Sequence, residues 1–80
     1  MPCFFFDIHE NEKVYRDDVG HELSDLDAAR KEAMKALPGI AYDEIPKDGD
    51  HQTFVCLVTD GDGKPVYSAT LSYVGQWLLR

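Results

Sequence analysis

The hydrophobic residues of this chain are concentrated in two unbroken runs, with alternating apolar and polar positions elsewhere. The runs are Cys-Phe-Phe-Phe at residues 3–6 and Phe-Val-Cys-Leu-Val at residues 54–58. Successive side chains of a strand point to opposite faces of a sheet, so an unbroken apolar run predicts a strand buried on both faces. The runs and alternations together predict four strands, at residues 3–9, 13–17, 52–59 and 66–74.

One amphipathic helix is predicted between the second and third strands. Ser24 is expected as its N-cap, with Asp27 completing a variant of the capping box. The expected apolar stripe repeats every three or four residues and comprises Leu26, Ala29, Ala33, Leu37 and Ile40. Because Pro38 lacks a backbone donor, an end or a kink is expected near Leu37. A short second helical turn through residues 42–45 is expected to follow.

These elements predict an α+β fold of ββαββ order in which residues 1–80 form a single domain. The expected sheet has four mainly antiparallel strands from two hairpins, and the main helix packs on one face. Strand order stays open, because two hairpins joined by a helix permit several arrangements. We expect the other face to be covered by a two-fold partner, by the segment around Trp77, or by both. The aromatic residues expected at this interface are Phe5, Tyr67, Tyr73 and Trp77.

Charge and size limit the classes of partner. The 80 residues carry a formal net charge of −7, which argues against a sequence-independent grip on nucleic-acid phosphates and against anionic membrane surfaces. Aromatic side chains on an open sheet can stack bases, but here they lack clustered lysines and arginines, so nucleic acid is not the expected partner. A chain this small gains stability from self-association, so a homodimer is expected.

The two cysteines, Cys3 and Cys56, both lie in apolar strand runs. The sequence shows no secretory signal pattern and no stretch of the roughly 20 apolar residues that span a membrane. The expected location is therefore the cytoplasm, with reduced and buried thiols. Neither cysteine has the Cys-x-x-Cys or His-Cys spacing of a redox or metal site.

Candidate chemistry is sparse. Asp60-Gly61-Asp62-Gly63 resembles the start of a calcium loop, but the rest of an EF-hand is missing, and the segment is interpreted as a hairpin turn. The candidate acid–base or metal site near the first hairpin comprises Asp7, His9, Arg16, Asp17 and Asp18. No His-x-x-x-His spacing, nucleophile elbow or phosphate loop accompanies these residues. Catalytic, cofactor-binding and metal residues are therefore not assigned, and no cofactor is expected.

Four sequence segments carry a family resemblance. The chain opens with Met-Pro-Cys-Phe-Phe-Phe-Asp, and residues 17–25 read Asp-Asp-Val-Gly-His-Glu-Leu-Ser-Asp. Residues 28–33 read Ala-Ala-Arg-Lys-Glu-Ala, and residues 58–66 read Val-Thr-Asp-Gly-Asp-Gly-Lys-Pro-Val. These segments resemble the motifs of a family of small bacterial proteins of unknown function, seen mainly in rhizobia and related alphaproteobacteria. The resemblance spans nearly the whole chain and implies no activity, substrate or catalytic residue, because the family has none established.

The expected function is that of a small non-enzymatic, dimeric accessory or regulatory module that binds a protein or a small ligand. The alternative is a small enzyme or metal-binding protein that uses the acidic and histidine residues near the first hairpin. An excess of apolar strand surface without a catalytic set favours the first hypothesis.

Overall fold

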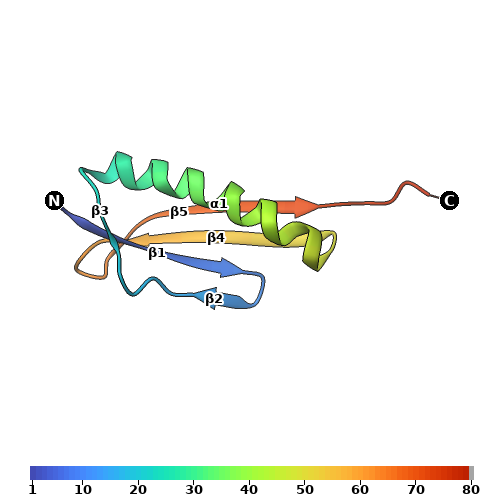
Figure 1. Ribbon diagram of the computed structural model, residues 1–80, viewed down its shortest axis with the longest axis horizontal. Coiled ribbons are helices and arrows are strands. Elements are labelled where there is room, and N and C mark those ends of the chain that lie inside the picture. Colours follow the sequence, from blue (N-terminus) through green and yellow to red (C-terminus); the bar gives the residue numbers. More distant parts are fainter. Residues whose placement is uncertain (80) are drawn as a thin grey trace.

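The computed structural model describes residues 1–79 and shows one helix lying across a sheet (Figure 1). The strands span Cys3–Glu10 (β1), Lys13–Tyr15 (β2), His21–Glu22 (β3), His51–Thr59 (β4) and Pro65–Val74 (β5), and the helix spans Leu26–Asp48 (α1). The strand pairs are antiparallel in the order β2-β1-β4-β5, and β3 pairs separately with β1. The predicted α+β class is confirmed. The two-residue β3 was not predicted, so the element order is βββαββ rather than ββαββ.

The pairing register aligns side chains in rows on the face that packs against α1. The rows are Phe6 with Val58 and Tyr67, Ile8 with Cys56 and Ala69, and Glu10 with Phe54 and Leu71. The central strand β4 contributes the most deeply buried of these side chains, namely Phe54, Cys56 and Val58. The hydrophobic core therefore lies between β4 and the helix. The apolar run at residues 54–58 predicts burial on both faces, but within the single chain only the helix face is fully buried, and Val55 and Leu57 on the other face are partly buried.

Small side chains on α1 let the helix lie close to the sheet. Its buried positions are Ala29, Ala33, Leu37 and Ala41, three of which are alanines. The stripe predicted from sequence is confirmed at Ala29, Ala33 and Leu37. Leu26 is 60% exposed instead, because it is the first helical residue and borders a groove at the end of the sheet.

The N-cap of α1 is Asp25. Its Oδ1 accepts a hydrogen bond from the backbone N–H of Ala28 at 2.9 Å, and its backbone is extended where the chain enters the helix. The predicted Ser24 cap with Asp27 is therefore wrong by one residue. Serine and aspartate are similarly good caps, but the carboxylate also interacts favourably with the positive end of the helix dipole.

The helix α1 continues through Pro38 to Asp48, so the predicted end near Leu37 is wrong. Pro38 removes the N–H that would bond the Met34 carbonyl. Both Pro38 and Met34 are exposed, so water can satisfy that carbonyl. Burial of Leu37 and Ala41 on either side of the proline keeps the helix on the sheet. No helix within residues 1–79 is both long and apolar enough to cross a membrane.

A buried amide fastens the C-terminal end of α1 to the sheet. Gln52, at the start of β4, is 3% exposed. Its Nε2 donates hydrogen bonds to the carbonyl oxygens of Ile45 at 2.8 Å and Gly49 at 2.7 Å. These carbonyls belong to the last turn and cap of the helix, where backbone acceptors lack intrahelical partners. Gln52 thus replaces the missing donors.

No helix or strand among the described residues covers the face of the sheet opposite α1, and only the loop at Gly20 lies against one end of it, at Cys3 and Phe5 (Figure 1). We call it the open face; its side chains include Phe5, Asp7, His9, Thr53, Val55, Leu57, Ser68, Thr70 and Ser72. Residues 75–79 run out past the end of the sheet, and Trp77 in this segment is 79% exposed. The segment around Trp77 therefore does not cover the open face of its own chain, in contrast to one of the alternatives expected from the sequence.

Candidate functional site

A carboxylate closes the outer edge of β1 between the points where β2 and β3 pair with it. Asp17 Oδ2 accepts a hydrogen bond from the Phe6 N–H at 3.1 Å. Its Oδ1 accepts from the N–H groups of Val19 at 3.0 Å and Gly20 at 2.9 Å. The Asp17 N–H in turn donates to Asp7 Oδ1 at 2.9 Å. Because neither β2 nor β3 reaches Phe6, Asp17 replaces the missing strand partner there.

The environment of Asp17 favours its ionised form. Partial burial acts to raise the pKa of this carboxyl, but the backbone hydrogen bonds from Gly20, Phe6 and Val19 lower it, and so does the nearby His21. The net pKa lies below the ordinary value of 3.8. His21 Nδ1 lies 3.7 Å from Oδ2. Asp17 is thus a fixed anion whose oxygens are engaged by the backbone, which is an architectural role.

The structure brings together two of the five residues predicted as an acid–base or metal site. Asp7 and Asp17 are joined by the hydrogen bond described above. His9 lies on the open face opposite Val14 and Val55, while Arg16 and Asp18 are exposed beside Asp17 in the sequence. Among the side chains that the structure describes, which are those of residues 1–47 and 49–79, no three His, Cys, Asp or Glu residues are grouped so as to hold a metal ion.

The predicted interface residues lie on different surfaces. Phe5 is on the open face, because its partner in β4 is Thr59 and alternation places it with Leu57. Tyr67 and Tyr73 pair with Val58 and Gln52 and so lie on the helix side of β5. Trp77 lies beyond the end of that strand. The four residues therefore do not form one continuous aromatic surface within a single chain, and the same division applies to the base-stacking platform considered above.

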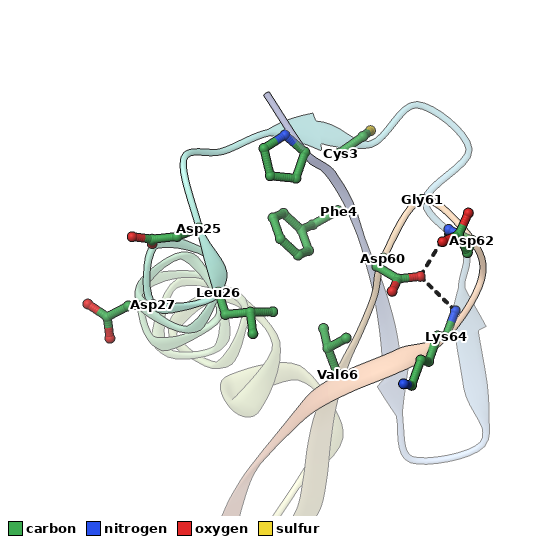
Figure 2. Close-up of a pocket in the computed structure, with 11 residues that line it drawn as sticks. Cys3, Phe4, Asp25, Leu26, Asp27, Asp60, Gly61, Asp62, Lys64 and Val66 are labelled. Carbon is green, nitrogen blue, oxygen red and sulfur yellow. Dashed lines mark hydrogen bonds between the residues drawn. The ribbon is translucent and has the colours of Figure 1, made fainter.

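A groove opens at the end of the sheet where α1 begins and the β4–β5 turn lies (Figure 2). We call it the end groove; its volume is about 860 Å³. Its apolar lining comes from Pro2, Phe4, Leu26 and Val66, and its carboxylates are Asp25, Asp27, Asp60 and Asp62. Figure 2 shows Leu26 and Val66 facing each other across it, below Phe4. The end groove is thus apolar inside, with a mainly acidic rim that also carries Lys64.

The carboxylates of the end groove differ in their hydrogen-bond and ion-pair partners. Asp60 Oδ1 shapes the turn by accepting hydrogen bonds from the N–H groups of Asp62 and Lys64, each at 2.9 Å (Figure 2). Asp27 forms exposed ion pairs with Lys31 at 3.2 Å and Arg30 at 3.6 Å. The sequence prediction of a hairpin turn at residues 60–63 is confirmed. The sequence does not reveal that this turn faces the start of the helix, because the position of the turn relative to the helix depends on strand order.

The buried thiol is unsuited to nucleophilic chemistry. Cys56 is fully buried in the core. Burial raises the pKa of Cys56 to about 11, and the negative charge of Asp7 acts in the same direction. The thiol therefore stays protonated at neutral pH, and both Cys56 and Cys3 are free of disulfides.

These observations define a small single-helix α+β domain with one open sheet face and an acidic end groove. Residues 3–72 match the family model described as a domain of unknown function, DUF6894, and the chain belongs to this family. The match confirms the resemblance to a family of unknown function drawn from the sequence. No curated protein and no solved structure matches the chain.

Proposed function

We propose that this chain is a non-enzymatic binding module whose working surface is the open face of its sheet. The observation that carries this proposal is the partly buried apolar strip formed by Phe5, Val55 and Leu57, which no helix or strand of the described residues covers; the loop at Gly20 lies against Phe5 at one end of it. Strand side chains on such a face are stabilised when a partner removes them from water. The chain thus has apolar surface available for a partner.

The chemistry around the apolar strip indicates the kind of partner. On one side lie the hydroxyl side chains of β5, Ser68, Thr70 and Ser72, all exposed. On the other side lie Asp7 and His9 of β1, both partly buried. An apolar centre with a polar margin matches the composition of protein–protein interfaces. We therefore propose a protein partner that presents a flat apolar patch ringed by hydrogen-bonding groups.

The polar groups of the chain support binding over catalysis. Asp17 is engaged by backbone N–H groups, and Cys56 is a buried, protonated thiol. His21 lies 3.7 Å from Asp17, but backbone N–H groups already occupy both oxygens of that carboxylate, and Cys56 is buried away from any substrate. Asp17 therefore stabilises the edge of the sheet, and Cys56 belongs to the hydrophobic core.

The test compares capture of proteins from cell extract by the immobilised wild type, Val55→Lys and Met34→Lys. Val55 lies in the centre of the open face, whereas Met34 is on the exposed side of α1, so both variants replace an apolar residue by lysine. A specific partner should be captured by wild type and Met34→Lys but not by Val55→Lys. Titration with that purified partner should show at least a roughly tenfold loss of affinity for Val55→Lys. Equal affinity of all three proteins for every captured partner refutes the proposal.

A further inference from the structure

The two long edges of the sheet are built differently. The edge at β1 is protected against pairing with another chain. Its outer strand β2 has only three residues and begins with Lys13, and the Phe6 N–H beyond β2 is bonded by Asp17. The edge at β5 is ten residues long and carries no charged side chain. A β-bulge between Val58 and Thr59 affects only the first residues of β5. Long, uncharged edge strands are templates for pairing with another chain.

The backbone of β5 presents unpaired hydrogen-bonding groups at regular intervals. The Gly75 N–H donates to the Asp50 carbonyl at 2.7 Å, so residue 75 points its polar groups toward β4. Backbone direction alternates along a strand, so Tyr73 and Leu71 do the same. The N–H and C=O groups directed outward are those of Ser68, Thr70, Ser72 and Val74, whose side chains are all exposed. These groups form a ladder without a partner strand among the described residues.

We propose that β5 pairs antiparallel with β5 of a second copy, about a two-fold axis near Thr70, and that residues 75–79 of each copy enter the end groove of the other. In such a pair the end of one strand lies beside the start of its partner, so Val74 lies beside the partner's Val66. Residues 75–79 then run along the partner's β4–β5 turn, which forms one wall of the end groove.

Side-chain direction and chemistry agree with this arrangement. Odd-numbered residues of β5 face the helix side, so an extended continuation places Trp77 and Leu79 on that side, where the end groove opens. In the single chain these side chains are 79% and 80% exposed. The groove offers apolar walls from Leu26 and Val66 beneath its acidic rim. Residues 75–79 carry no acidic side chain, so their entry avoids repulsion by the rim carboxylates.

The pairing goes beyond the proposed function and is compatible with it. A two-fold axis perpendicular to the joined sheet leaves both helices on one side and both open faces on the other. The open faces of the two copies thus form one continuous surface for the partner of the module. Val55, whose substitution tests the open face, lies on β4, one strand in from the paired edge and opposite Thr70. The open-face test measures affinity for a captured protein and the pairing test measures molar mass, so failure of one proposal is distinguishable from failure of the other.

The experiment measures molar mass by light scattering, together with the emission of Trp77, the single tryptophan of the chain, over a wide dilution series. The double variant Thr70→Lys with Ser72→Lys places lysines of the two copies close together across the proposed pair, so that their positive charges repel. Its control is Val14→Lys with Thr53→Lys, which adds the same charge to exposed positions of the same face on β2 and β4, outside the strand that forms the proposed pair. Wild type and control should be dimers at high concentration, with emission shifted to shorter wavelength than in the diluted monomer.

The edge variant should raise the dimer dissociation constant about a hundredfold relative to the control. It should also keep the emission of an exposed tryptophan. A monomeric wild type up to millimolar concentration overturns the proposal, and so does an edge variant that dimerises like its control. A dimer whose Trp77 emission equals that of the monomer overturns the insertion into the end groove. Circular dichroism of each variant establishes that it is folded before the comparison.

Discussion

Replacing Asp17 by alanine tests whether one carboxylate closes the outer edge of β1. The substitution removes the acceptor of three backbone N–H groups, those of Phe6, Val19 and Gly20. The Val19 bond is exposed, so water replaces the carboxylate there at little cost. The other two bonds are partly buried, and a hydrogen bond to a charged group contributes about 1.5–3 kcal/mol. The two bonds together amount to about 3–6 kcal/mol, and water that reaches the partly buried N–H groups in the variant offsets part of this loss, so we expect Asp17→Ala to lower the free energy of unfolding by about 2–4 kcal/mol.

Two further variants sharpen the measurement, which is urea unfolding followed by circular dichroism. Asp17→Asn keeps an oxygen acceptor for Val19 and Gly20 but turns a donor toward the Phe6 N–H. Its expected loss is about 1–2 kcal/mol. Asp18→Ala removes a neighbouring exposed carboxylate and should change stability by less than about 0.5 kcal/mol. Equal stability of Asp17→Ala and Asp18→Ala refutes the assignment of Asp17 as the edge cap.

The same interaction predicts a pH dependence with a definite sign. The pKa of Asp17 is lowered in the folded chain, so the unfolded chain takes up a proton first as the pH falls. The stabilisation by the carboxylate is therefore complete above its ordinary pKa of 3.8 and is lost as the pH falls through the lowered value. The stability difference between wild type and Asp17→Ala should be constant near neutral pH and shrink below about pH 4. A difference that stays constant into strong acid contradicts the pKa assignment.

The remaining predictions concern the glycine at residue 20, the helix interior around Pro38, and the buried thiol. Gly20→Ala should destabilise the fold by about 2 kcal/mol or more in urea unfolding, because φ is +79° and the new Cβ would lie 2.7 Å from Cys3 Sγ. Pro38→Ala should raise the free energy of unfolding by about 1–3 kcal/mol, because alanine favours a helix interior more than proline does. Gly39→Ala should raise it by about 0.5–1 kcal/mol, because the added Cβ has no neighbouring atom within 4 Å. A melting temperature below that of the wild type in either variant contradicts this prediction. Iodoacetamide at pH 8 should label Cys3 in the native protein and Cys56 only after unfolding, as mass spectrometry can determine.

The sequence predicted those parts of the fold that depend on local pattern. The apolar run at residues 54–58 marks the central buried strand, and the Asp-Gly repeats mark the turn that follows it. The alanine spacing in α1 identified the face that packs. Each of these signals is set by the alternation of a strand, the period of a helix or the backbone freedom of glycine. They do not require knowledge of which strands are neighbours.

The errors arose where tertiary contacts outweigh local preference. Pro38 predicts an end or a kink, but the helix does not end there: it continues to Asp48, with buried residues on both sides of the proline. The candidate site near the first hairpin was predicted from proximity in sequence, and the structure shows that Asp17 instead bonds the backbone of β1. The end groove was not predicted, because it forms between the start of α1 and a turn more than thirty residues away. Only the strand order brings these segments together.

The arrangement of the core connects these observations. One helix packs through alanines on one face of the sheet, so the core between them is thin and its largest fully buried side chains all belong to β4. A domain of this size retains a small stability margin from such a core. Burying the open face, the β5 edge or Trp77 against another molecule adds to that margin in proportion to the binding free energy. The edge at β1 is closed by Asp17, whereas the edge at β5 has no comparable block. This asymmetry means that added stability from association is expected on the β5 side, where pairing can proceed without breaking an existing contact.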